Sequence, residues 1–154
     1  MIHKNISVKK SQIEGRGLFA DARISKGQQV LIFEGDSIRS QDLGNNVDLG
    51  DLFPTGPESY LVVHEPEMLI NHSCQPNTGF KDEVSLVSIK DIEPGEEVTF
   101  DYSTVGTDGW EIKCNCGSKA CRGKIADYKF LPSEIKSLYK TITPTWVLEF
   151  EAVA

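Results

Sequence analysis

The chain has 154 residues, of which 39% are hydrophobic and 25% charged, and its formal net charge is −7. This length suits one domain with its own core. The acidic surplus argues against binding along a phosphate backbone, which needs a basic face, so we expect no direct contact with nucleic acid. The same surplus would either attract a basic peptide or simply keep the protein in solution.

The first ten residues lack the apolar segment of a secretory signal. No stretch approaches the roughly 18 consecutive apolar residues that a membrane-spanning helix needs. We therefore expect a soluble intracellular protein, cytoplasmic or nuclear, that does not contact a membrane. A secreted effector is the remaining alternative.

Short strands and turns dominate the first two thirds of the sequence. Runs of apolar residues predict strands at residues 6–9, 18–20, 30–33, 60–63, 84–89 and 98–100. Residues 41–57 are rich in Gly, Asn, Asp and Pro, and we expect them to form a loop or a short irregular insert. Residues 65–70 are expected to form one helical turn. Many short strands with few helices predict a mostly β fold.

The composition changes at Gly106, after which Gly, Cys, Lys and Asn dominate as far as Gly123. A bound metal would explain how such a segment becomes ordered. A short helix is expected at 135–139, and the apolar residues 146–154 are expected to dock back on the domain or to pair with something. These changes divide the chain into a main domain at 5–105, a zinc-binding segment at 106–128 and a C-terminal extension at 129–154.

Four cysteines form a pattern that favours a structural metal site. Cys114, Cys116 and Cys121 follow the spacing Cys-x-Cys-x4-Cys, and Cys74 lies 40 residues upstream of the first of them. Structural zinc takes four ligands in a tetrahedron, and thiolate is a favoured donor. Disulfides are the alternative, but they are disfavoured in an intracellular chain. A site closed by four sulfurs leaves no place for water, so we expect it to clamp 113–123 onto 71–77.

Four segments stand out in the sequence, namely GRGLFA at 15–20, INHSCQPN at 70–77, EEVTFDY at 96–102 and the cysteine segment at 113–123. In this order they resemble the motifs of the SET-domain family of protein lysine methyltransferases, and the cysteine segment is similar to the family's post-SET zinc segment. The resemblance covers roughly residues 5–128. It implies the SET-domain fold, in which small curled β-sheets end in a C-terminal pseudoknot. It also implies that the main domain is the SET domain and the zinc-binding segment the post-SET segment.

The resemblance also implies an activity, namely methyl transfer from S-adenosylmethionine to a lysine side chain. The partner would be a basic protein or peptide that carries the target lysine, with a histone-like protein among the candidates. The nucleophile must be the neutral amine, which at pH 7 is only about one lysine in 2,500 for a pKa near 10.4. A narrow apolar channel would favour that form by penalising the ammonium.

The roles of single residues follow from the same resemblance. Catalytic roles fall to Tyr102 and Tyr60, and substrate contacts to Phe100 and Tyr102. A Phe at position 100 leaves room for di- or trimethylation. Contacts with the cofactor fall to Gly15, Arg16, Gly17, Tyr60, Asn71 and His72, and the zinc ligands are Cys74, Cys114, Cys116 and Cys121.

Each of these roles has a plainer alternative. The aromatic residues would also suit strand packing, the two glycines a tight turn, and the histidine a structural position. Asp101 is expected to support the fold by hydrogen bonds near residue 71. For the whole chain, the main rival to an enzyme is a non-catalytic SET module that binds a peptide or partner. A methyltransferase for a small amine or a non-histone protein is a third reading.

Overall fold

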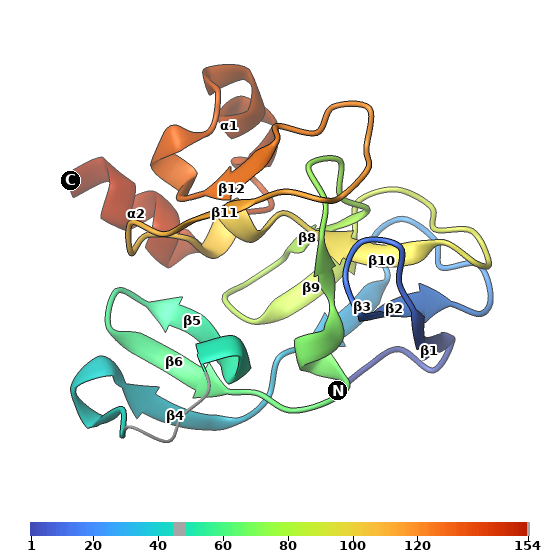
Figure 1. The fold of residues 1–154 in the computed structure, drawn as a ribbon, viewed down its shortest axis with the longest axis horizontal. Helices are drawn as coiled ribbons and strands as arrows, with labels where there is room; N and C mark the ends of the chain where they lie inside the picture. Colours follow the sequence, from blue (N-terminus) through green and yellow to red (C-terminus); the bar gives the residue numbers. More distant parts are fainter. Residues whose placement is uncertain (45–48, 154) are drawn as a thin grey trace.

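Residues 1–44 and 49–153, which the computed structural model describes, form four small β-sheets, two short α-helices and several 3-10 turns (Figure 1). The fold is mostly β, as predicted. None of the helices within these residues has the length and the apolar character needed to cross a membrane.

The first sheet brings three predicted motifs side by side. Its strands, in spatial order, are β1 (Ile6–Lys10), β2 (Arg16–Ala20), β10 (Glu97–Phe100) and β7 (Asn71–His72). β10 runs antiparallel to β2 and parallel to β7, with Thr99 opposite Asn71 and Phe100 opposite His72. The predicted strands that overlap β1, β2 and β10 are confirmed.

Side chains tie the segment after β7 to β10. Asn77 donates through Nδ2 to the main-chain oxygen of Glu97 at 2.8 Å and accepts through Oδ1 from the main-chain nitrogen of Thr99 at 2.9 Å. The main-chain nitrogen of Ser73 donates to the oxygen of Phe100 at 3.1 Å. Residues 73–77 are thus held against β10 by three hydrogen bonds. The pseudoknot that the resemblance implies stays a prediction.

The second sheet packs against the first in the main core. Its strands, in spatial order, are β3 (Gln29–Ile32), β9 (Ser85–Ser88) and β8 (Thr78–Phe80). The predicted strands at 30–33 and 84–89 are confirmed. Leu31 and Leu86 of this sheet and Leu18 and Val98 of the first are fully buried in one cluster. Each such side chain contributes about 1.5–3 kcal/mol through burial, so the two sheets stabilise each other.

The third sheet corrects one expectation. Its strands, in spatial order, are β4 (Asp36–Arg39), β6 (Ser59–Val62) and β5 (Leu52–Gly56). The interpretation of 41–57 as a loop is wrong at β5, because pairing with β6 and burial of Phe53 turn a Pro-containing segment into a strand. Pro54 is tolerated because β5 lies at the edge of the sheet. Residues 45–48 lie outside the described residues.

Short 3-10 turns connect these strands. They are η1 (Ser40–Asp42), η2 (Leu49–Asp51), η3 (Glu67–Leu69), η4 (Tyr102–Val105) and η5 (Tyr128–Phe130). The predicted helical turn at 65–70 is confirmed by η3. η4 begins directly after β10, where the side chain of Asp101 accepts from the main-chain nitrogen of Ser103.

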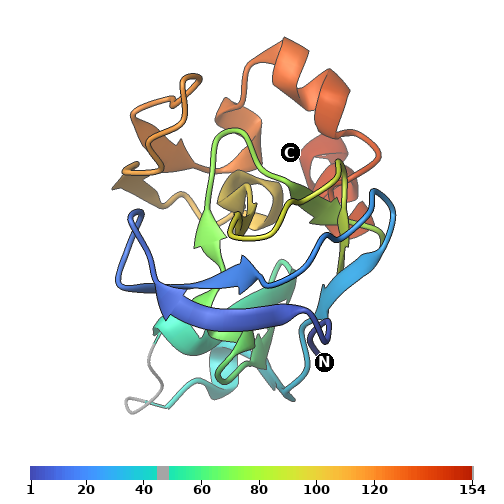
Figure 2. The same ribbon diagram turned by 90° about the vertical axis from the view of Figure 1, so that its right-hand side faces the viewer.

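The C-terminal third forms a layer of its own on top of the sheets, orange to red in both ribbon views (Figures 1 and 2). It contains a two-stranded sheet, β11 (Glu111–Lys113) with β12 (Lys124–Ala126), followed by α1 (Ser133–Tyr139) and α2 (Thr145–Val153). The predicted helix at 135–139 is confirmed by α1. α2 was not predicted as a helix, although it docks back through the fully buried Val147. The division of the chain at 105 and 128 stays a prediction.

Candidate functional site

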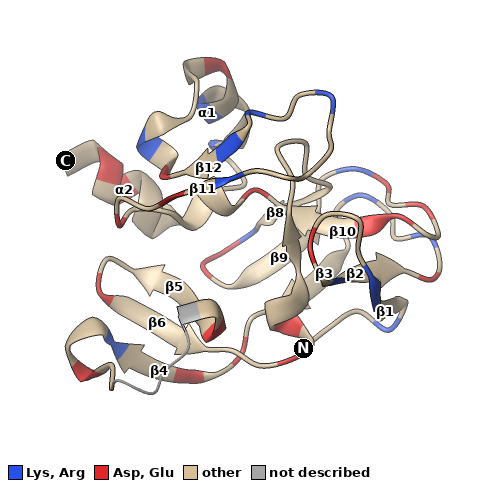
Figure 3. Ribbon diagram, in the orientation of Figure 1, with Lys and Arg blue, Asp and Glu red and all other residues tan. Residues whose placement is uncertain are grey.

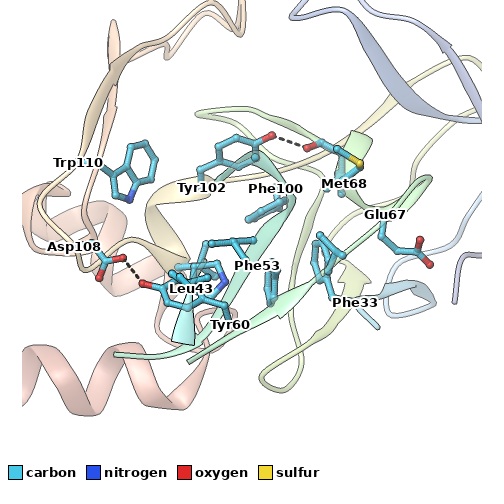
Figure 4. A pocket seen from close by; sticks show the side chains of 16 residues that line it. Phe33, Leu43, Phe53, Tyr60, Glu67, Met68, Phe100, Tyr102, Asp108 and Trp110 are labelled. Carbon is cyan, nitrogen blue, oxygen red and sulfur yellow. Dashed lines mark hydrogen bonds between the residues drawn. The ribbon is translucent and has the colours of Figure 1, made fainter. Parts of the chain in front are cut away.

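An apolar cavity of about 500 Å³ is bordered by the third sheet and the segment that follows β10 (Figure 4). Its walls are largely apolar, with several aromatic rings, and hold two carboxylates, Glu67 and Asp108. The aromatic lining residues are Phe33, Phe53, Tyr60, Phe100, Tyr102 and Trp110. The structure therefore gathers Tyr60, Phe100 and Tyr102 around one space. An apolar cavity disfavours an ammonium ion that has to give up its water. Aromatic faces can stabilise a cation that does enter.

Tyr60 reaches this cavity from β6 and is held by a carboxylate. Its hydroxyl donates to Asp108 Oδ2 at 3.0 Å (Figure 4). Burial raises the pKa of Tyr60 to about 12, and the hydrogen bond and charge of Asp108 add to the rise. Tyr60 is therefore a neutral phenol with its proton directed at Asp108.

Asp108 and Trp110 are residues of the cavity wall that the sequence analysis missed. They lie in the stretch GTDGW at 106–110, which reads as a turn. The one signal was an isolated tryptophan in an otherwise polar segment. The path of the chain after η4, which the sequence does not reveal, brings both to the cavity.

Phe100 and Tyr102 form the wall opposite Tyr60. Their ring centroids lie 4.9 Å apart, and Phe100 also meets Phe80 edge to face at 5.4 Å, so its ring is fixed on both sides. The Tyr102 hydroxyl donates to the main-chain oxygen of Ile70 at 2.6 Å (Figure 4). Burial raises the pKa of Tyr102 well above its usual range. Tyr102 is therefore not a general base at neutral pH, but its oxygen can still accept a hydrogen bond.

Asn71 holds the glycine loop (residues 14–17) in place through its side chain. Its Nδ2 lies within hydrogen-bond distance of three acceptors, namely the main-chain oxygens of Glu14 at 3.2 Å and Arg16 at 3.1 Å, and Glu97 Oε1 at 2.7 Å. A Cβ placed on Gly17 would lie 2.1 Å from Glu97 Oε1 and 2.9 Å from Asn71 Nδ2. A larger residue at position 17 would therefore force the side chains of Glu97 and Asn71 to move.

Gly15 and Arg16, which precede this glycine, play different parts in the loop. Gly15 has a φ of +42°, in the left-handed region that favours glycine. Arg16 gives its main-chain oxygen to Asn71, but its guanidinium pairs with Glu65 at the surface. Both charged groups of that pair are about half exposed, so it contributes little to stability.

His72 is a buried, neutral side chain. Burial lowers its pKa to about 4, against the opposing effect of the Asp101 charge. Its Nδ1 accepts from the main-chain nitrogen of Tyr102 at 3.2 Å, and its Nε2 lies 3.3 Å from Cys74 Sγ. Because Nδ1 is the acceptor, Nε2 carries the proton and donates to the sulfur. His72 thus links the tyrosine that lines the cavity to the cysteine cluster.

The cysteines meet at the base of the C-terminal layer, and all four are free thiols. Cys74 Sγ and Cys114 Sγ lie 3.7 Å apart. That distance matches the roughly 3.8 Å between two sulfurs in a tetrahedron with Zn–S bonds of about 2.3 Å. Ligand atoms of His72, Cys74, Cys114 and Cys116 all lie within 4.8 Å of one another. Cys121 is more exposed and lies outside this group, but its thiol contacts that of Cys114.

The predicted site residues therefore form two groups that meet at Tyr102. Tyr60 and Phe100 line the cavity. Asn71, His72 and the glycine loop lie outside its lining, and Tyr102 connects the cavity to them through its hydrogen bonds with Ile70 and His72. A reaction between two molecules, one held in the cavity and one at the glycine loop, fits this arrangement, because proximity and alignment can supply much of the rate.

Comparison with known proteins places these residues in a recognised pattern. The family described as SET domain matches residues 15–103 of the chain. This range includes the glycine loop, β7, β10 and the residues up to Ser103. It leaves out the cysteine segment and both α-helices.

Curated relatives resemble most of the chain but are much longer. The histone-lysine N-methyltransferase TRX1 of Oryza sativa subsp. japonica is 27% identical over an alignment of 143 residues, and the match covers 80% of this chain and 14% of that protein. The histone-lysine N-methyltransferase trithorax of Drosophila virilis is 32% identical over an alignment of 134 residues, and the match covers 76% of this chain and 4% of that protein. The chain thus spans a small part of the length of these relatives.

Two similar solved structures have a related fold. A crystal structure of KRYPTONITE in complex with mCHG DNA and SAH has a TM-score of 0.66 and 24% identity, and covers 80% of this chain and 29% of that one. A second, in complex with mCHH DNA, H3(1–15) peptide and SAH, has a TM-score of 0.61 and 25% identity, with coverage of 80% and 30%.

Proposed function

The chain belongs to the SET-domain family, and from this premise we propose that it is a protein-lysine N-methyltransferase that uses S-adenosylmethionine. One observation carries the proposal. Tyr102 lines an aromatic cavity suited to an alkylamine and is hydrogen-bonded to Ile70 and His72, the two neighbours of Asn71, which together with the glycine loop is suited to a cofactor. The relatives named above carry the name histone-lysine N-methyltransferase, and the two similar structures are complexes with SAH.

The glycine loop, Asn71 and His72 fit the cofactor. S-adenosylmethionine, when bound, supplies an electrophilic methyl group on a sulfonium. The main-chain oxygens of Glu14 and Arg16 each keep a free lone pair for its ammonium group, and Asn71 Oδ1 is an additional acceptor. Because Gly17 has no side chain, this loop can lie close to Asn71 and Glu97. His72 would contribute through its main chain, since its ring is engaged by Tyr102 and Cys74.

The residues of the cavity would prepare the amine. Loss of water on entering the apolar cavity disfavours the ammonium form and so raises the fraction of neutral nucleophile. Tyr102 and Tyr60 stay protonated at neutral pH, because burial raises the pKa of both. We infer that they orient the amine through their oxygens and that neither removes its proton. Alignment of the amine with the methyl group would then supply most of the rate.

The number of methyl groups transferred would depend on Phe100. Its ring lines the cavity beside Tyr102 and carries no hydroxyl that would hold a water there. The space next to the amine is therefore free for a methylated nitrogen. We propose di- or trimethylation as the outcome.

The charge of the chain supports a basic peptide as substrate. Residues 34–67 hold eight acidic residues and one basic residue, Arg39, whereas the rest of the chain holds 15 of each. The whole net charge therefore lies in the segment that builds the third sheet and much of the cavity wall. Figure 3 shows acidic positions on and beside β4 and β6. A basic, histone-like peptide would be steered towards this side.

Zinc held by Cys74, Cys114, Cys116 and Cys121 would fix the C-terminal layer. The sulfur spacing of Cys74 and Cys114 fits a tetrahedral site. His72 is the competing fourth ligand by distance, but its Nε2 carries the proton and donates to Cys74. Cobalt substitution tests this choice, because the visible spectrum distinguishes four sulfurs from three sulfurs and a nitrogen. A three-sulfur spectrum would replace Cys121 by His72.

The activity is tested by incubating the protein with labelled S-adenosylmethionine and mixed basic proteins. We expect label transfer by the wild type and a loss of about a hundredfold or more in Tyr102→Phe, with cofactor affinity measured by calorimetry in both. A wild type that neither binds the cofactor nor transfers the label contradicts the proposal. Binding of a basic peptide without transfer would instead support a non-catalytic module.

A further inference from the structure

Asp101 is a buried carboxylate at which three separate segments meet. It is 1% exposed and follows β10 directly. Both terminal nitrogens of the Arg122 guanidinium donate to it, at 2.7 and 2.8 Å. The hydroxyl of Tyr139, the last residue of α1, donates to it at 3.1 Å, and the main-chain nitrogen of Ser103 does so at 3.1 Å.

These donors satisfy the carboxylate evenly. Oδ2 accepts from Arg122 Nη1 and Tyr139, whereas Oδ1 accepts from Arg122 Nη2 and Ser103. A buried carboxylate is costly unless it is paired and hydrogen-bonded, so each donor helps to fix its rotation. That rotation in turn sets where the planar, two-pronged guanidinium of Arg122 can lie.

Arg122 and Asp101 connect the cysteine segment to the residues around His72. Arg122 directly follows Cys121, and its main-chain nitrogen lies 3.4 Å from Cys74 Sγ as a donor. Asp101 directly precedes Tyr102, whose main-chain nitrogen donates to His72. A shift of the Asp101–Arg122 pair therefore moves the cysteine segment relative to the loop that holds Asn71 and His72.

We propose that the C-terminal extension completes the site, and that the Tyr139 hydroxyl is a positioning residue that holds the cysteine segment closed over the cofactor side. The role of α1 would be to deliver this hydroxyl to Asp101. Asp101 lies within residues 15–103, which the family model matches, whereas Tyr139 lies beyond them in the C-terminal extension. The consequence for the cofactor rests on the function proposed above.

The test uses two variants of the full chain. Tyr139→Phe removes only the hydroxyl and keeps the ring in its cluster with Tyr128, Leu131 and Val147. Val147→Ala is the control, because it opens a gap in the same cluster without removing a hydrogen bond to Asp101. We expect Tyr139→Phe to weaken binding of S-adenosylmethionine about tenfold, equivalent to about 1.4 kcal/mol. Val147→Ala should lower the melting temperature more, yet leave cofactor affinity within about twofold.

A second readout does not depend on the cofactor. Hydrogen–deuterium exchange of the cofactor-free protein should be about tenfold faster over residues 113–123 in Tyr139→Phe than in the wild type, and nearly unchanged there in Val147→Ala. Equal exchange in Tyr139→Phe and wild type would overturn the proposal, as would equal effects of the two variants on this segment. A wild type that fails to bind cofactor would refute the proposed function alone, because the exchange result still decides whether Tyr139 closes the segment.

Discussion

A methyl group added at residue 17 tests the close packing behind Tyr102. In Gly17→Ala the new Cβ would lie 2.1 Å from Glu97 Oε1, so the carboxylate has to move. That carboxylate accepts from Asn71 Nδ2 at 2.7 Å and from Ser11 Oγ at 2.9 Å. A hydrogen bond to a charged group contributes about 1.5–3 kcal/mol, and Glu97 is partly exposed, so we expect a loss of about 2 kcal/mol in the free energy of unfolding.

This loss corresponds to a fall of about 4–8 °C in melting temperature for a chain of this size, and cofactor affinity should fall with it because Asn71 is displaced. Thermal unfolding followed by circular dichroism measures the first effect and calorimetry the second. Gly44→Ala is the matched control, since among the described residues a Cβ there meets no heavy atom within 4 Å. In a Glu97→Ala background the cost of Gly17→Ala should drop below about 1 kcal/mol. An undiminished cost there, or a cost no larger than that of Gly44→Ala, would refute the reasoning.

Three further predictions follow from the contacts of the site. Cys74→Ser should lose zinc in a metal assay and also weaken cofactor binding in calorimetry, because Cys74 accepts from His72 beside Asn71; retained affinity in a zinc-free variant would separate the two sites. Phe100→Tyr should shift the products towards monomethyl-lysine in mass spectrometry, and an unchanged product pattern would remove Phe100 from this role. Since the pKa of Tyr60 is about 12 in the fold, against about 10 in an unfolded chain, its contribution to stability is full below pH 10 and is lost as the pH rises through 12. Tyr60→Phe should therefore flatten the decline of stability in this range, and a profile identical to wild type would show that Tyr60 is not the titrating group.

The elements that local patterns specify could be predicted from the sequence. β2 and β10 are short apolar runs next to turns, and both were predicted as strands, although their pairing through Leu18 and Val98 was not. The motif residues were also found through the resemblance to the SET-domain family, and the fold brings Tyr60, Phe100 and Tyr102 to one cavity. Their roles remain proposals, since geometry shows where they lie and not what they bind.

The rest depends on long-range pairing that composition does not encode. β5 contains a proline and forms only because β6 lies beside it. Asp108 reaches Tyr60 through the path of a turn. The sequence suggested that Asp101 supports the fold near residue 71, but its partners Arg122 and Tyr139 lie 21 and 38 residues away. Nothing local to those positions signals that they meet.

The central claim is that an amine in the aromatic cavity receives a methyl group from S-adenosylmethionine held by the glycine loop and Asn71. Mass spectrometry of a basic peptide array incubated with the protein and S-adenosylmethionine tests it most directly. The account predicts added methyl groups, two or three on one nitrogen, on peptides that contain a preferred lysine, and none when that lysine is replaced by arginine. A wild type that binds the cofactor but adds no methyl group to any lysine peptide would contradict it.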